Sequence, residues 1–125
     1  MSVFKDQERF MRACDQSTDD YNPQQYAMYL GLIDEEVEEL IVAVGDNNQE
    51  EQLDALIDIL VVTIGALHSG GFDAEGAWQE VMRTNFAKID PETGKVRKRE
   101  DGKVLKPTGW VAPDLKTFIS KQGEI

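Results

Sequence analysis

Cysteine and histidine are almost absent, since the 125 residues include one of each, Cys14 and His68. A lone cysteine permits neither an internal disulfide nor a thiolate metal cluster, which agrees with a reducing compartment, and we expect Cys14 to be a small buried side chain. One histidine is too few for the paired Glu-x-x-His motifs of a di-iron helical bundle. His68 falls at the end of a predicted helix, where the helix dipole favours an imidazolium, so we expect it to have a structural role.

Long apolar runs are also missing. No stretch approaches the roughly 20 apolar residues that a membrane span needs. The first residues, MSVFKDQERFMRACDQ, have neither the basic nor the apolar region of a signal peptide. We therefore expect a cytoplasmic protein without a membrane partner. A chain of this length should form one domain, with a helical core over about residues 1–89 and a basic arm over about residues 90–125.

Positive charge is scarce before residue 83. Residues 1–82 hold 3 Lys or Arg against 18 Asp or Glu, whereas residues 83–125 hold 10 against 6, and the net charge is −11. An acidic body repels phosphates, so we expect no nucleic acid as a partner. Divalent cations are the natural intermediary between such a surface and any phosphate ligand.

What is present is helical periodicity, which predicts an all-α fold, a bundle of four to five helices. Apolar residues recur three and four positions apart in four segments. These segments are about residues 2–16, 24–44, 50–68 and 73–88. Ser2 and Asp73 are suited to cap the first and the fourth helix, and Gly45 to end the second.

The third predicted helix is apolar on more sides than one neighbouring helix covers. Its main stripe is Leu53, Leu56, Ile57, Leu60, Ile64 and Leu67, and its other side carries Val61, Val62 and Gly65. We expect this helix to be buried on several faces, and a domain of this size has few other elements to cover it. The pattern therefore predicts a homo-oligomer with apolar, helix-packed interfaces.

Two carboxylate clusters lie on the second and third predicted helices. Glu35, Glu36 and Glu39 fall within a sector of roughly 100° on the second helix, and Glu51, Asp54 and Asp58 within roughly 60° on the third. The short loop between the helices favours an antiparallel pair, which can bring the clusters face to face. A hard divalent cation bound through oxygen relieves the resulting repulsion, and Mg²⁺ suits such ligands best.

Two other interpretations of these acids are weaker. A run such as EEVEE is on its own typical of a solvated helix face. Asp58, however, stands between Ile57 and Ile59 in an apolar helix, where an unpaired charge is costly. The DNNQEE segment resembles a calcium loop in its alternate oxygen ligands, but Glu51 stands where that loop needs glycine and Ile57 where it needs a bidentate glutamate.

The arm differs from the rest of the chain. Turn signals at ETGK and EDGK surround two short segments, Val96–Arg99 and Val104–Lys106, which predicts a small hairpin or an ordered arm. Because phosphate groups held in an acidic pocket need added positive charge, we expect the arm to close over any phosphate ligand. The candidate substrate-binding residues are Arg83, Asn85, Lys88, Lys95, Arg97, Arg99 and Lys103.

With these motifs in place, the sequence resembles the MazG-like all-α nucleoside triphosphate pyrophosphohydrolases, which include phosphoribosyl-ATP pyrophosphohydrolase, and in particular a bacterial and phage subgroup. The resemblance rests on EEVEEL, on EQLD followed by DILVVTIGAL, on EVMRTNFAKID and on REDGKVLKPTGWVAPDL. It implies homodimers or dimers of dimers that bind Mg²⁺, or Mn²⁺ in its place. It also implies cleavage of a nucleotide between the α and β phosphates.

The resemblance and the acid pattern together assign roles to the carboxylates. The expected metal ligands are Glu36, Glu39, Asp54 and Asp58, with Glu51 as a further candidate. Glu35, the extra acid beside them, is the expected catalytic base. Three functions stay open: hydrolysis of a (deoxy)nucleoside triphosphate, hydrolysis of phosphoribosyl-ATP, or a non-catalytic acidic module that binds a protein.

Overall fold

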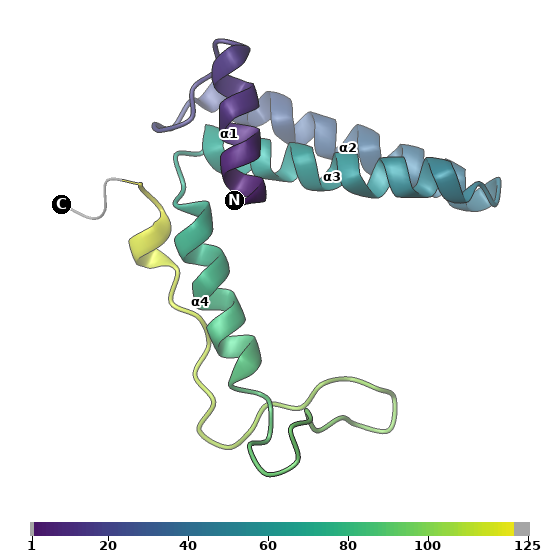
Figure 1. Ribbon diagram of the computed structural model, residues 1–125, viewed down its shortest axis with the longest axis vertical. Coiled ribbons are helices and arrows are strands. Elements are labelled where there is room, and N and C mark those ends of the chain that lie inside the picture. The colour runs from purple at the N-terminus through teal and green to yellow at the C-terminus, as the bar shows by residue number, and fades with distance from the viewer. Residues whose placement is uncertain (1, 122–125) are drawn as a thin grey trace.

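The computed structural model describes residues 2–121, which form a helical protein (Figure 1). The elements in chain order are α1 (Val3–Ala13), α2 (Pro23–Gly45), α3 (Gln49–Ser69), α4 (Ala74–Phe86) and a short 3₁₀ helix, η1 (Lys116–Phe118). Within the described residues the only extended pairing consists of two isolated bridges in the arm. The prediction of an all-α fold is therefore confirmed.

Each α-helix begins at a polar residue whose side chain accepts a hydrogen bond from the backbone three residues later. Ser2 and Asp73 cap α1 and α4 in this way, as the sequence predicts. Asn22 and Asn48 cap α2 and α3, and Pro23 occupies the first turn of α2, where its missing N–H is not needed. Local sequence therefore fixes all four starts.

The helices form an open arrangement rather than a closed bundle (Figure 1). α2 and α3 lie side by side as a long antiparallel pair, and α1 crosses this pair near one of its ends. α4 leaves the end of α3 at a steep angle and extends away from the pair, with the arm beyond it. A wide angle therefore separates most of α4 from the α2–α3 pair.

The buried core lies where α1 crosses the pair. Met11, Tyr29 and Ala66 are at most 5% exposed, and the partly buried Tyr26, Leu32, Ile33 and Val62 pack around them. Gly65 lies directly under the Tyr29 ring, so that a Cβ there would overlap the ring. The Tyr29 hydroxyl donates a hydrogen bond of 2.5 Å to Gln16 Oε1, which ties α2 to the residues after α1.

The first half of α3 is not buried within one chain, so this chain alone does not supply the expected burial of the helix on several faces. Leu53, Leu56, Ile57 and Leu60 are between 46% and 63% exposed. α4 turns away from the α2–α3 pair (Figure 1), so the helices that pack on α3 are mainly α2 and α1. The expectation for Cys14 is also wrong, because this side chain is exposed at the end of α1.

By length and composition alone, α3 could also cross a membrane. It has 21 residues and a mean hydropathy of 1.4 in its most apolar window. The core helix of a soluble protein gives the same values, and α3 packs along α2 and against α1. The length and hydropathy of α3 are therefore weak evidence for a membrane span.

The arm begins with a small irregular hairpin over residues 89–106, as the turn signals predict. Bridges join Ile89 to Val96 and Lys98 to Val104. Gly94 and Gly102 adopt positive φ angles of 70° and 88° at the two turns, a conformation that suits glycine. Together these contacts give the hairpin a defined shape.

Residues 107–121, the return segment, lead back along α4 to the helix junction (Figure 1). The Trp110 indole N–H donates to the Thr84 carbonyl at 2.7 Å. The backbone N–H of Asp73 donates to the Phe118 carbonyl at 2.8 Å, and that of Lys121 to the Gly71 carbonyl at 3.0 Å. The return segment thus braces α4 against the junction.

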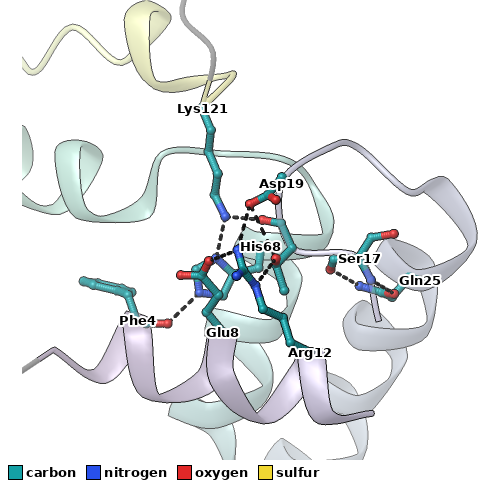
Figure 2. A network of polar contacts seen from close by, with 9 residues as sticks. Phe4, Glu8, Arg12, Ser17, Asp19, Gln25, His68 and Lys121 are labelled. Atoms are coloured by element: carbon teal, nitrogen blue, oxygen red, sulfur yellow. Dashed lines mark hydrogen bonds and ion pairs between the residues drawn. The ribbon is translucent and has the colours of Figure 1, made fainter. Parts of the chain in front are cut away.

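Lys121 ends the return segment inside a polar network at the junction (Figure 2). Its ammonium group donates to the Thr18 carbonyl and, at 3.0 Å, to His68 Nδ1. The other ring nitrogen, Nε2, lies 2.7 Å from the Phe4 carbonyl. His68 is 3% exposed and joins three parts of the chain, which agrees with a structural role.

Candidate functional site

The α2–α3 pair brings carboxylates from both helices together around Glu36. Glu36 and Glu39 lie one helical turn apart on α2, while Asp54 and Asp58 lie one turn apart on α3. All three neighbours are close enough to Glu36 to act on its ionisation. The antiparallel pairing of α2 and α3 thus places Glu36 and Glu39 near Asp54 and Asp58.

Glu36 is the most constrained of these acids. Its Oε2 atom is buried and has no hydrogen-bond partner. Burial raises the pKa of the Glu36 carboxyl, and a hydrogen bond with Glu39 and the negative charges of Glu39, Asp58 and Asp54 raise it further. A buried, unsatisfied oxygen among like charges is unfavourable, and either a proton or a cation would relieve it.

Beside this group is an open hollow of about 620 Å³ toward the loop that joins α2 to α3. Its lining includes Glu35, Glu39 and Glu51 among the predicted site residues. It also includes Glu38, which lies outside the sector of the other acids, and Asp46, which follows the predicted end of the helix at Gly45. Glu39 belongs both to the hollow and to the group around Glu36, and therefore connects the two.

The donors present fit a hard divalent cation. They are all carboxylates, which are the protein ligands that Mg²⁺ prefers, and the unpartnered Glu36 oxygen has capacity for a ligand. Within residues 2–121, no three Asp, Glu, His or Cys side chains already lie close enough together to hold one ion. Chelation would therefore require these carboxylates to rotate toward the ion.

Two predicted cations, Arg83 on α4 and Lys88 just after it, differ in their surroundings. Arg83 donates two hydrogen bonds to Glu80, of 2.8 and 3.0 Å, and Glu80 also accepts the Asp114 backbone N–H. The guanidinium of Arg83 and this N–H lower the pKa of Glu80 to about 2. Lys88 donates to the amide oxygen of Asn85 at 3.1 Å. Arg83 thus has a carboxylate partner within its own helix, whereas Lys88 has a neutral one.

The predicted cations of the arm separate in the same way. Arg99 pairs with Asp101 at 2.5 Å, so it already has a carboxylate partner. Arg97 lines a hollow at the end of α4, and Lys95 and Lys103 are exposed. The arm lies beyond α4, away from the α2–α3 pair, and does not cover the acids of its own chain (Figure 1).

This fold, with facing acids on a long antiparallel helix pair, defines an all-α protein of the MazG-like class. The family model for phosphoribosyl-ATP pyrophosphohydrolase (PRA-PH) matches residues 4–85, which is more than half of the chain. The chain belongs to this family, which is part of the MazG-like all-α NTP pyrophosphohydrolase superfamily. Membership supports a pyrophosphohydrolase activity in general, that is, hydrolysis of an acid anhydride.

One curated relative is the uncharacterized protein L479 of Acanthamoeba polyphaga mimivirus. It is 39% identical over 72 residues, which are 56% of this chain and 29% of the relative. The chain thus spans less than a third of the length of that protein. The family match ends at residue 85, so the arm lies outside it.

Proposed function

We propose that the protein is a Mg²⁺-dependent nucleotide pyrophosphohydrolase that cleaves a (deoxy)nucleoside triphosphate between the α and β phosphates. The products would be a nucleoside monophosphate and pyrophosphate. The observation that carries the proposal is the buried, unpartnered oxygen of Glu36 among the carboxylates of Glu39, Asp54 and Asp58. Membership of a pyrophosphohydrolase family supports the type of bond that is cleaved.

The acids would have two roles, metal binding and general-base catalysis. Glu36, Glu39, Asp54 and Asp58 would hold Mg²⁺, which when bound neutralises charge on the triphosphate. Glu35 is exposed beside Glu39 in the hollow, where solvent and substrate have access. It would accept the proton of the attacking water as the bridging P–O bond breaks and pyrophosphate leaves. Glu51 lines the same hollow and is a further candidate ligand.

Phosphoribosyl-ATP is the second candidate substrate. The matching family is named for phosphoribosyl-ATP pyrophosphohydrolase, which favours this substrate. The same acids would serve both reactions, because each breaks an anhydride bond between the α and β phosphates. The arm favours the first candidate, since it lies outside the matched residues and adds cations that the helical core lacks.

We also propose a homodimer or a dimer of dimers that acts in the cytoplasm, without a membrane partner or a nucleic acid partner. The uncovered apolar face of α3 supports the oligomer. Because the arm lies away from the acids of its own chain, a nucleotide that contacts both would lie between two copies (Figure 1).

Pyrophosphate release from a panel of nucleotides, including phosphoribosyl-ATP, tests the proposal. We expect release from at least one deoxynucleoside or nucleoside triphosphate, dependent on Mg²⁺ and lost in Glu39→Gln. Glu92→Gln is the matched control, since it removes the same charge from an exposed site on the arm. Preference for phosphoribosyl-ATP would select the second candidate. No Mg²⁺-dependent release from any nucleotide would refute the proposal and favour a non-catalytic binding module.

A further inference from the structure

A second hollow, here called the arm pocket, lies between the C-terminal end of α4 and the hairpin. Its volume is about 370 Å³. Three cationic side chains line it, Lys88 from the end of α4 and Arg97 and Lys106 from the hairpin, together with one acid, Asp90. This volume is at the small end of the range for ligand pockets. The arm pocket therefore suits a small anionic group rather than a whole nucleotide.

The three cations of the arm pocket lack carboxylate partners. Among residues 2–121, neither Lys88, Arg97 nor Lys106 forms an ion pair. Two other cations nearby do form ion pairs, since Arg83 pairs with Glu80 and Arg99 with Asp101. The arm pocket thus brings together three cations whose charge no ion pair compensates.

Trp110, beside the arm pocket, contacts two of these cations. The ammonium groups of Lys88 and Lys106 each lie 5.0 Å from the centre of its ring. The ring attracts each cation, but the two ammonium groups repel one another. The indole is itself fixed by its hydrogen bond of 2.7 Å to the Thr84 carbonyl. An anion in the arm pocket that contacts both lysines would relieve their repulsion without moving the ring.

Backbone hydrogen bonds form the walls of the arm pocket before any ligand binds. The N–H of Asp90 donates to the Lys95 carbonyl at 2.8 Å, and that of Leu105 donates to the Arg97 carbonyl at 2.8 Å. These bonds hold the hairpin segment with Arg97 beside the segment that leads to Lys106. Since the hairpin is ordered in this way, little further ordering is needed on binding.

We propose that the arm pocket binds the phosphate chain of the nucleotide through Lys88, Arg97 and Lys106. The identity of the anion rests on the proposed function, whereas the presence of an anion site rests on the pocket itself. A diphosphate or triphosphate chain carries three to four negative charges, which complements three cations and one acid. Lys106 and Trp110 thereby join the functional residues, although the sequence alone did not single them out.

The test uses Trp110 as a reporter in the full chain. The protein has two tryptophans; Trp110 contacts Lys88 and Lys106 of the arm pocket, whereas Trp78 contacts Phe4 on α1. In a Trp78→Phe background, tripolyphosphate is titrated without Mg²⁺ at constant ionic strength while Trp110 fluorescence is measured. We expect a saturable change, because an anion that draws Lys88 and Lys106 toward itself alters the surroundings of the ring.

Single substitutions then locate the site. Arg97→Gln and Lys106→Gln should each raise the Kd for tripolyphosphate by about tenfold, as expected for the loss of one charge-assisted hydrogen bond. Lys116→Gln is the matched control, since it removes the same charge from an exposed site on η1 that does not line the arm pocket, and it should change the Kd less than twofold. An equal effect of Lys116→Gln, or no saturable change at all, would overturn the proposal.

Further ligands identify the source of the anion. Nucleoside triphosphates should compete with tripolyphosphate, whereas a nucleoside without phosphates should not, and competition by the bare nucleoside would overturn the assignment to the phosphate chain. Repeating the tripolyphosphate titration in Glu39→Gln tests the arm pocket by itself, because this variant alters one of the acids on α2 and leaves the residues of the arm pocket unchanged. Failure of pyrophosphate release by the unaltered protein would refute the proposed function, and failure of the titration would refute the arm pocket.

Discussion

Lys121 Nζ lies 3.0 Å from His68 Nδ1, although the two residues are 53 positions apart in the chain (Figure 2). An ammonium group can only donate, so Nδ1 accepts and the proton of the neutral imidazole is on Nε2, which donates to the Phe4 carbonyl. The histidine is thereby specified as neutral. The helix dipole at the end of α3, which favours an imidazolium, is outweighed by burial and by the adjacent ammonium group.

Acidification should therefore destabilise the protein through His68. Burial lowers the pKa of His68 and the Lys121 charge lowers it further, while the Phe4 carbonyl and the carboxylates of Glu8 and Asp19 act in the opposite direction. Because the unfolded chain binds the proton at its ordinary pKa of about 6.5, the free energy of unfolding should fall below that pH until the lowered folded pKa is reached. The slope should approach roughly 1.4 kcal/mol per pH unit.

Denaturant unfolding between pH 7.5 and 5 measures this dependence. His68→Gln should flatten the part of the curve that begins near pH 6.5, and Lys121→Met should reduce the drop by removing the repelling charge. As His68 is the only histidine, NMR titration of its ring gives the folded pKa without ambiguity. A measured pKa at or above the ordinary value would contradict this account of the junction.

Removal of one negative charge from the acidic group should stabilise the metal-free protein. Glu36→Gln replaces a carboxylate with one buried oxygen, whose pKa is raised by the charges of Glu39, Asp54 and Asp58. We expect the melting temperature without Mg²⁺ to rise by about 3–6 °C, equivalent to roughly 1 kcal/mol for a domain of this size. The stabilisation by added Mg²⁺ and the pyrophosphate release should both be lost. The control Glu92→Gln should change neither the melting temperature, nor the stabilisation by Mg²⁺, nor the pyrophosphate release. A lower melting temperature for Glu36→Gln would show that the four acids do not repel one another.

The helix starts and the facing acids could be predicted because they depend on neighbours in sequence. Asp73 caps α4 through a residue three positions away, and a loop of three residues suffices to oppose Glu36 to Asp58. The direction of α4 could not be predicted, since it depends on how the return segment braces the junction. The pairing of Arg83 with Glu80 follows helical spacing and could have been found, whereas the arm pocket requires the fold of the hairpin.

Gly65→Ala should destabilise the fold at the crossing of α1, α2 and α3. A Cβ at this position would overlap the Tyr29 ring, which is buried in the core. We expect a loss of about 1–3 kcal/mol in the free energy of unfolding, which is the usual effect of overpacking. Gly31→Ala is the matched control, because no atom lies within 4 Å of its added Cβ. It should stabilise α2 by about 0.5–1 kcal/mol. A change of the same sign in the free energy of unfolding for both variants would refute the close approach of Gly65 to the Tyr29 ring.

The exposed face of α3 should be the contact between copies of the chain. Leu56 is 52% exposed within one chain, and Leu53, Ile57 and Leu60 lie beside it on the same face. Leu56→Lys places a charge there, which an apolar interface tolerates poorly but a solvent-exposed surface accepts. Sedimentation should therefore show the unaltered protein as a dimer or tetramer and Leu56→Lys shifted toward the monomer of 14.1 kDa.

The matched control is Val111→Lys, since Val111 is 69% exposed on the return segment, away from α3. It should leave the assembly unchanged. If a nucleotide lies between two copies, the Leu56→Lys monomer should keep tripolyphosphate binding in the arm pocket yet lose pyrophosphate release. A monomer with full turnover would show that the acids act without a second copy, and an unaltered protein that sediments as a monomer would refute the interface itself.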